Sequence, residues 1–341
     1  MEPMATLKYV SMFAMASFLF APVANTQAPQ PTQTTGSEQH STPGQLVDAF
    51  NAVFGEQRPS VRANHAKGVD LEGVFRPSAS ASSVSKAPHL QRISVSVTVR
   101  FSNFGGNVAV SDTDALASPR GMSIKFRLPD GSETNIVAHA FNGFPVPTTD
   151  QLREFLLALA ASGPGAAKPT PLDSFLGAHP LTKAFLEGQI PPPVSYATVS
   201  YFGVNAFKFT NASGKVAFTR YQIRPEAGDH SSPKDEIEKA DANYLSNEIK
   251  ERVSRGPIRF TLLVQIADPG DNLNDPSIVW PDTRTKVELG TIEITKTVAD
   301  NAVAERQLLF LPGTLPDGIE AEDPMINARH AAYPVSFGRR Q

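Results

Sequence analysis

The sequence predicts an α+β fold in which an antiparallel eight-stranded β-barrel is surrounded by peripheral helices. Many short segments alternate apolar and polar residues, which is typical of strands with one buried face. The helical segments fall between them without the regular strand and helix alternation of a parallel sheet, so an antiparallel barrel is favoured. At 341 residues the chain is long enough to bury a full core.

The first strands follow from period-two alternation. ISVSVTVRFSNF, residues 93–104, and GMSIKFRL, residues 121–128, alternate β-branched and aromatic residues with polar ones. TNIVAHAF, residues 134–141, follows LPDGSE, where Asp130 and Gly131 suit a tight hairpin turn. We therefore expect strands here, the last two joined as a hairpin.

Helices are indicated at both sides of this region. Apolar residues follow helical spacing from Pro43, with Thr42 as a possible N-cap. TTDQLREFLLALAAS predicts a helix over about 149–161, and a second helix is expected over 180–187, joined by a loose Gly, Pro and Ala-rich connection.

The remaining segments complete the count of about seven or eight strands. Residues 195–225 predict two strands around a turn at Asn211–Gly214, and residues 258–268 and 285–296 predict the last two. Between these pairs, ANYLSNEIKERVSRG, residues 242–256, has the pattern of an amphipathic helix.

The N-terminus has the pattern of a secretory signal. Lys8 precedes an apolar run from Tyr9 to Ala21, which is shorter than the roughly 20 residues that a transmembrane helix needs. We expect a signal peptide over 1–24, a flexible linker over 25–43 and a folded domain over 44–341, with export to the periplasm and no membrane association after cleavage. The alternative is an uncleaved anchor.

Composition restricts the kind of site. A formal net charge of −3 gives no indication of nucleic acid as a partner. The chain has no cysteine, which excludes disulfides, zinc thiolate sites and cysteine nucleophiles. Any metal must therefore be bound by histidine, tyrosine or carboxylate side chains.

The C-terminal segment contains a candidate iron ligand. Asp323 and Pro324 suit the start of a helix, which would place Arg329 and Tyr333 on one face at positions i and i+4. Nearby positive charge favours the phenolate form of tyrosine, and a phenolate can bind iron. The alternative is a surface helix whose tyrosine covers the core while its arginines face water.

Two further groups of residues suggest a polar site. His65 follows Arg62 by three residues in a segment with strand character, and Arg100 and Ser102 share the polar face of one predicted strand. On a straight strand Arg62 and His65 would face opposite sides, so both can reach one site only if the chain bends. Each group alone is also common in proteins without such a site.

Taken together and in this order, R-x-x-H-A-K-G, V-R-F-S, P-R-G-x-x-x-K-F and R-x-x-x-Y resemble the haem catalase superfamily. The sequence is most similar to its small, secreted branch, the catalase-related peroxidases, from about Gln45 to Arg340. This resemblance implies a catalase-like barrel with haem, an iron protoporphyrin, as cofactor.

The resemblance also implies roles for individual residues. His65 matches the distal histidine that moves a proton between the oxygens of hydrogen peroxide, and Ser102 matches the serine that supports it. Tyr333 matches the proximal iron ligand, and Arg329 the arginine that keeps it anionic. The residues that match the cations paired with the haem propionates are Arg62, Arg100 and Arg340.

The sequence departs from the large catalases at specific positions. His139 stands where they have a distal asparagine, and Phe337 where they have a further histidine after the tyrosine. The N-terminal arm and C-terminal helical domain of the large enzymes are absent from this sequence. We therefore expect weak or no catalase activity and a monomer or dimer.

The function that the resemblance implies is haem-dependent reduction of hydrogen peroxide, or organic peroxides, with small organic electron donors. Two alternatives stay open. One is a haem enzyme that rearranges hydroperoxides on the same scaffold, and the other is a noncatalytic exported barrel that binds haem or an apolar ligand.

Overall fold

The computed structural model describes residues 41–55 and 61–341. These residues belong to one compact unit, His40–Gln341. The predicted signal peptide and most of the predicted linker lie outside the described residues. Within the described ranges, no helix is both long enough and apolar enough to cross a membrane.

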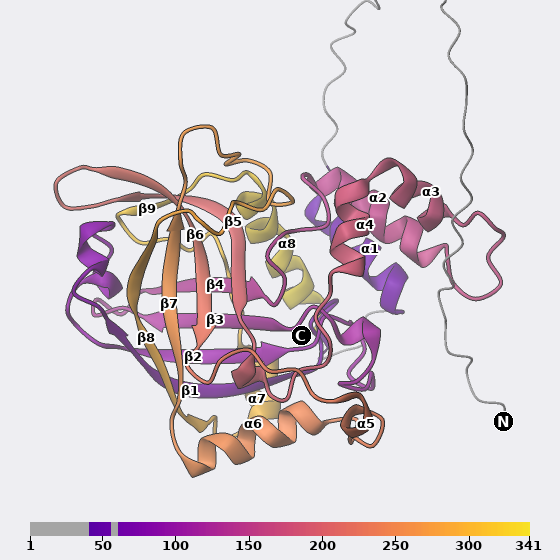
Figure 1. Ribbon diagram of the computed structural model, residues 1–341, viewed down its shortest axis with the longest axis horizontal. Coiled ribbons are helices and arrows are strands. Elements are labelled where there is room, and N and C mark those ends of the chain that lie inside the picture. Colours follow the sequence, from indigo (N-terminus) through magenta and orange to yellow (C-terminus); the bar gives the residue numbers. More distant parts are fainter. Residues whose placement is uncertain (1–40, 56–60) are drawn as a thin grey trace, which may run out of the picture. The chain divides into compact units, whose positions relative to one another are not determined.

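Eight antiparallel strands close into a barrel (Figure 1). Each pairs with the next along the chain, β8 also pairs with β1, and a bridge between His139 and Phe202 joins β4 to β5. The strands are β1 (Gly68–Pro77), β2 (Val95–Ser102), β3 (Gly121–Arg127), β4 (Glu133–His139), β5 (Tyr201–Thr210), β6 (Val216–Pro225), β7 (Ile258–Ile266) and β8 (Lys286–Thr297). The predicted eight-stranded antiparallel barrel is confirmed, and a short strand, β9 (Ile319–Ala321), pairs with β5 in addition.

Strand register separates an apolar face from a polar face. Leu71, Val99, Ile124 and Ile136 are register partners across β1 to β4, and all four belong to the main apolar core. Because side chains alternate along a strand, the residues next to this row point to the opposite face. The sequence predicted this alternation correctly.

The opposite face of the same strands carries the polar residues. One row pairs Asp70 with Arg100, and Arg100 with Ser123. The next pairs Ser102 with Gly121, and Gly121 with His139. This face therefore collects residues of four strands that sequence analysis had considered separately.

Helices α1 to α4 form a separate cluster beside the barrel (Figure 1). They are α1 (Pro43–Phe54), α2 (Thr149–Ala160), α3 (Pro171–Ala178) and α4 (Pro180–Glu187). Thr42 and Gln45 form the capping box of α1, so this helix begins at the predicted end of the linker. The predicted helices at 149–161 and 180–187 are confirmed, but α3 occupies part of the segment predicted as a loose connection.

The remaining helices border the barrel. They are α5 (Lys234–Ile237), α6 (Tyr244–Arg255), α7 (Asn301–Gln307) and α8 (Met325–Arg339). Helix α8 begins one residue later than predicted, with Pro324 as N-cap, although the Asp323 carboxylate still accepts the Met325 backbone N–H at 2.8 Å. An ion pair of 2.6 Å between Asp48 and Arg339 joins α1 to α8.

Candidate active site

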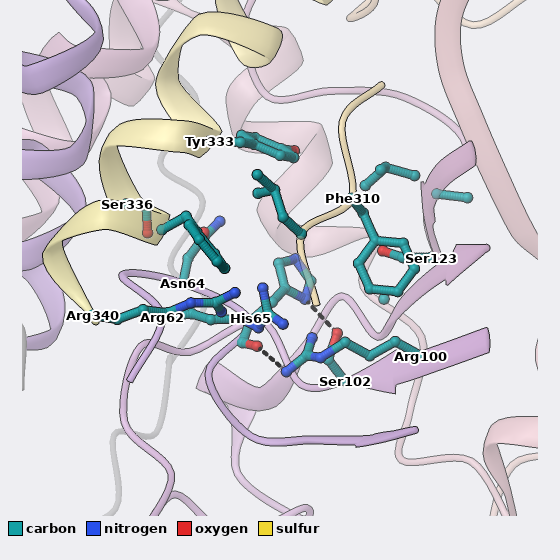
Figure 2. Close-up of a pocket in the computed structure, with 15 residues that line it drawn as sticks. Arg62, Asn64, His65, Arg100, Ser102, Ser123, Phe310, Tyr333, Ser336 and Arg340 are labelled. Carbon is teal, nitrogen blue, oxygen red and sulfur yellow. Dashed lines mark hydrogen bonds between the residues drawn. The ribbon is translucent and has the colours of Figure 1, made fainter. Parts of the chain in front are cut away.

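A cavity lies between the polar face of β2 to β4 and helix α8, with about 640 Å³ of empty space that includes an opening to solvent. Figure 2 shows Tyr333 entering it from α8, while His65, Ser102 and Arg100 lie together at another part of its wall. The apolar residues of its wall are Val137, Ala138, Leu309, Phe310 and Phe337. All seven residues predicted for the site meet near it: Arg329 holds Tyr333, and the others line the cavity directly.

His65 does not lie on a strand, as its sequence context had suggested, but in the turn that precedes β1. Its φ of 51° is in the left-handed region, and no other residue except glycine has a positive φ in the described ranges. The turn is fixed because the His65 N–H donates to the Phe104 carbonyl at 2.7 Å, and Arg100 Nη2 donates to the His65 carbonyl at 2.8 Å. This bend allows Arg62 and His65 to reach the same cavity, which a straight strand would prevent.

The His65 imidazole is held in one orientation. Its Nδ1 lies 3.0 Å from Ser102 Oγ, and its ring packs edge-on against Phe104. Gly121 lies beneath the ring, where an added Cβ would come within 2.7 Å of Nδ1. A larger residue at position 121 would displace the imidazole, a requirement that sequence analysis did not identify.

Burial keeps the His65 ring neutral. Desolvation, followed by the positive charge of Arg100, lowers its pKa from 6.5 to about 3. A neutral imidazole that donates from Nδ1 to Ser102 leaves Nε2 free to accept a proton. The site therefore contains a base that is available across the physiological pH range.

Because the pKa of His65 is low, we expect the rate of reaction with hydrogen peroxide to change little as the pH falls below neutrality. We expect the rate of reaction with hydrogen peroxide to stay within about twofold between pH 8 and pH 5, since protonation would disable His65 only near pH 3. Stopped-flow measurements in buffers of constant ionic strength provide the test. A tenfold fall centred near pH 6.5 would show that the imidazole has its ordinary pKa.

Tyr333 and Arg329 interact along one face of α8. Arg329 donates to Tyr333 Oη from Nε at 3.1 Å and from Nη2 at 2.9 Å, which realises the predicted i, i+4 pair. Both donors point at the phenolic oxygen, which therefore acts as a hydrogen-bond acceptor toward Arg329. A tyrosine oxygen held in this way is a candidate iron ligand.

A chain of side chains supports Arg329 in turn. Its Nη1 donates to Asn205 Oδ1, and Asn205 Nδ2 donates to Asp323 Oδ2 at 2.7 Å. Sequence analysis missed Asn205 as a member of the site because it lies on β5, more than a hundred residues before α8. Residues that hold a metal ligand through hydrogen bonds, as Asn205 and Asp323 would here through Arg329, orient that ligand.

Three arginines border the cavity near His65. The side chains of Arg62, Arg100 and Arg340 all line it. Burial lowers the pKa of Arg62 to about 9 and that of Arg340 to about 10, so all three are charged at neutral pH. A buried cluster of cations needs anions for compensation.

This set of residues fits an iron porphyrin. The cavity has apolar walls, an oxygen ligand with a cationic partner, an imidazole on another side and a cluster of cations that suits carboxylate groups. Tyr333 supplies this oxygen, and Arg329 is its cationic partner. Fold and site together define an antiparallel β-barrel with a polar cavity whose lining suits a haem.

The chain belongs to the catalase family. The sequence model of that family, described as "Catalase", matches residues 21–162 and 172–340. A catalase-related peroxidase of Mycolicibacterium paratuberculosis is 35% identical over 307 residues, which cover 88% of this chain and 95% of that protein. Another, from Synechococcus elongatus, is 32% identical and is covered over 88% of both chains. These relatives place the chain in the peroxidase branch, as the sequence motifs predicted.

Larger catalases share the fold but exceed this chain in length. Catalase-2 of Bacillus subtilis is 28% identical, and the match covers 44% of it. The solved structures of a fungal catalase and of catalase A from Saccharomyces cerevisiae both superpose with a TM-score of 0.73, at 21% and 19% identity. They cover 91% and 92% of this chain, while it spans about two thirds of theirs, 66% and 68%.

Proposed function

We propose that this protein is a haem-dependent peroxidase that reduces hydrogen peroxide or organic peroxides with small organic electron donors. The observation that carries this proposal is the presence of a neutral, oriented imidazole and an arginine-bonded phenol in one cavity. Relatives named catalase-related peroxidase support the same reaction class.

Each polar residue then has a definite task. Tyr333 would bind the iron, with Arg329 stabilising the phenolate, and Arg62, Arg100 and Arg340 would pair with the propionates. When bound, the haem supplies the electrons that reduce the peroxide. His65 Nε2 accepts the proton of one peroxide oxygen and returns it to the oxygen that leaves as water, while Ser102 Oγ holds Nδ1.

The proposed reaction is tested with the purified, haem-loaded chain, hydrogen peroxide and a phenolic donor. We expect oxidation of the donor in proportion to the peroxide consumed. Sustained product formation from a lipid hydroperoxide without any donor would instead indicate a rearranging enzyme. A haem spectrum without peroxide turnover would indicate a noncatalytic haem-binding barrel.

We also propose that the chain is exported to the periplasm through residues 1–24 and acts as a monomer or dimer. The apolar run after Lys8 supports export. N-terminal sequencing of the protein from the periplasmic fraction tests both the export and the cleavage site, and light scattering gives the mass in solution. An uncleaved N-terminus in the membrane fraction would contradict the proposal.

Weak dismutation is the expected consequence of His139. This residue pairs with Gly121 across β3 and β4, on the face that bears Ser102. Its Nδ1 accepts the Phe141 N–H at 3.4 Å, and its Nε2 is buried without a hydrogen-bond partner in the described ranges. Phe144 and Phe185 pack around the ring, so the surroundings of position 139 are bulkier and less polar than those of an amide would be.

Replacing His139 with asparagine is expected to raise oxygen release from hydrogen peroxide by about tenfold, the effect of 1.4 kcal/mol on the barrier of the second peroxide's reaction. A smaller amide would make room for that second peroxide and offer it a hydrogen-bond donor. An oxygen electrode measures the rate, and His139→Phe is the matched control that provides no donor. Equal oxygen release from the two variants would contradict a role for position 139.

A further inference from the structure

Two buried carboxyl groups lie behind the cavity's arginines. Glu305 comes from α7 and Asp70 from β1, and neither was identified from the sequence motifs. Both lie close to Arg62 and Arg100, whose charges act on both acids. This arrangement bears directly on which charge the cavity presents to a cofactor.

Glu305 holds two of the arginines by their inner edges. Its carboxylate accepts Arg100 Nε at 2.7 Å and Nη2 at 2.9 Å, and it also accepts Arg62 Nε at 3.3 Å. The Arg62 Nη2 donates instead to the carbonyls of Glu305 and Leu308. In both arginines Nη1 has no hydrogen-bond partner among the described residues, so each guanidinium keeps N–H donors for an anion in the cavity.

The close packing of this pair requires a glycine. A Cβ on Gly68 would lie 2.3 Å from Arg100 Nη2 and 2.7 Å from Glu305 Oε1. Glycine at the start of β1 therefore allows the ion pair to form against the backbone. Asn301 fixes α7 to the same strand, because its Oδ1 accepts the Asp70 N–H at 2.8 Å.

Asp70 is the second acid. It is the register partner of Arg100, is fully buried, and neither carboxyl oxygen has a hydrogen-bond partner in the described part of the chain. Burial and then the negative charge of Glu305 raise its pKa to about 7, against the opposite effects of Arg100 and Arg62. Burial alone would raise the pKa of Glu305, but the positive charges of Arg100 and Arg62 outweigh burial and lower it. Glu305 is thus the ionised acid of the pair, and Asp70 exchanges its proton near neutral pH.

The charges can be counted for each state of Asp70. Arg62, Arg100 and Arg340 contribute +3 and Glu305 contributes −1, so the cluster carries +2 with Asp70 protonated and +1 with Asp70 ionised. A porphyrin with two propionates brings −2. The protonated state matches that ligand, and this step depends on the proposed haem function.

We propose that Glu305 and Asp70 are positioning residues of the haem site, and that binding of a dianionic porphyrin takes up a proton on Asp70. Glu305 orients the guanidiniums, and Asp70 sets their net charge. Binding of the propionates stabilises the protonated form of Asp70. Because linkage is reciprocal, protonation of Asp70 strengthens the binding of the propionates to the same extent. Porphyrin affinity therefore falls as the pH rises through neutrality.

The test titrates the haem-free full chain with metal-free protoporphyrin, which separates anion recognition from iron ligation and from activity. We expect affinity at pH 8 to be about 5- to 10-fold weaker than at pH 6, because a group with a pKa of about 7 falls from about nine-tenths to about one-tenth protonated over this range. In Asp70→Asn this change falls below about twofold, since the amide cannot titrate. In Glu305→Gln the midpoint moves to lower pH, because the charge that raises the pKa of Asp70 is gone.

Two controls make the result specific. Glu72→Gln removes a carboxylate on the same strand that pairs with Lys296 at the surface, and it should keep the wild-type pH profile. Protoporphyrin dimethyl ester has no carboxylates and should bind the wild-type chain without pH dependence, a comparison that needs no variant to fold. A wild-type profile in Asp70→Asn, or equal pH dependence for diacid and diester, would overturn the proposal. If porphyrin binding depended on pH in this way but the haem-loaded protein did not turn over peroxide, the proposed enzymatic function would be wrong. The inference about Glu305 and Asp70 would still hold.

Discussion

Replacing Tyr333 with phenylalanine is expected to abolish stable haem binding. The phenolic oxygen is the iron ligand in this account, and phenylalanine removes that atom while keeping the ring. Loss of a supporting residue at a metal site typically costs 10- to 100-fold in affinity, so loss of the ligand itself should cost at least about 100-fold. The ratio of Soret to protein absorbance after purification measures the remaining haem.

A matched variant separates ligation from folding. Tyr244→Phe makes the same chemical change at a tyrosine that donates to the Pro193 carbonyl at 2.7 Å, outside the cavity. It should keep wild-type haem content, and circular dichroism should show both variants folded. Full retention of the ferric haem spectrum by Tyr333→Phe would exclude this tyrosine as the ligand.

Replacing His65 with alanine is expected to leave haem binding largely intact and to slow the reaction with hydrogen peroxide by about 10²- to 10⁴-fold, the usual contribution of a general acid or base. Without the imidazole, the polar residues that line the cavity beside the peroxide are Ser102, whose hydroxyl is a poor base, and the arginines, which stay protonated, whereas His139 does not line the cavity. Stopped-flow absorbance at the Soret band gives the rate.

The control for this variant is His230→Ala. His230 is exposed in a loop, where its Nε2 lies 2.9 Å from the Ala227 carbonyl. Its loss should leave the rate unchanged. If His65→Ala reacted with peroxide as fast as this control at equal haem content, proton transfer by His65 would have to be abandoned.

Local patterns sufficed to predict most of the barrel. Alternation in residues 93–104 predicted β2, and Asp130 with Gly131 predicted the hairpin between β3 and β4, where Gly131 has a φ of 84°. Helix α3 was missed although Thr170, Pro171 and Asp173 repeat the capping pattern of α1. Its apolar pattern extends over only eight residues, too few to stand out from a Gly, Pro and Ala-rich segment.

Site residues divide according to how far apart their partners lie in sequence. Arg329 and Tyr333 are one helical turn apart, so their contact follows from helix geometry alone. The Glu305 partners lie about 205 and 243 residues earlier in the chain, and no local pattern indicates them. Such contacts depend on how the barrel closes and where α7 returns to β1.

The backbone of His65 illustrates a second limit. A left-handed conformation at a residue other than glycine is unfavourable, so propensity favours the strand assignment. The surrounding structure overrides this preference, because the His65 N–H donates to the Phe104 carbonyl and Arg100 donates to the His65 carbonyl. Residues with rare backbone conformations often occur at functional sites. At His65 the left-handed backbone sets the direction in which the imidazole of the proposed base points.

The most direct test of the central claim is the absorption spectrum of the purified full chain, expressed with abundant haem, before and after one equivalent of hydrogen peroxide. The account predicts a ferric haem spectrum of the tyrosinate-ligated type that changes within the mixing time and returns when a phenolic donor is added. A colourless protein, or a haem spectrum that peroxide leaves unchanged, would contradict it.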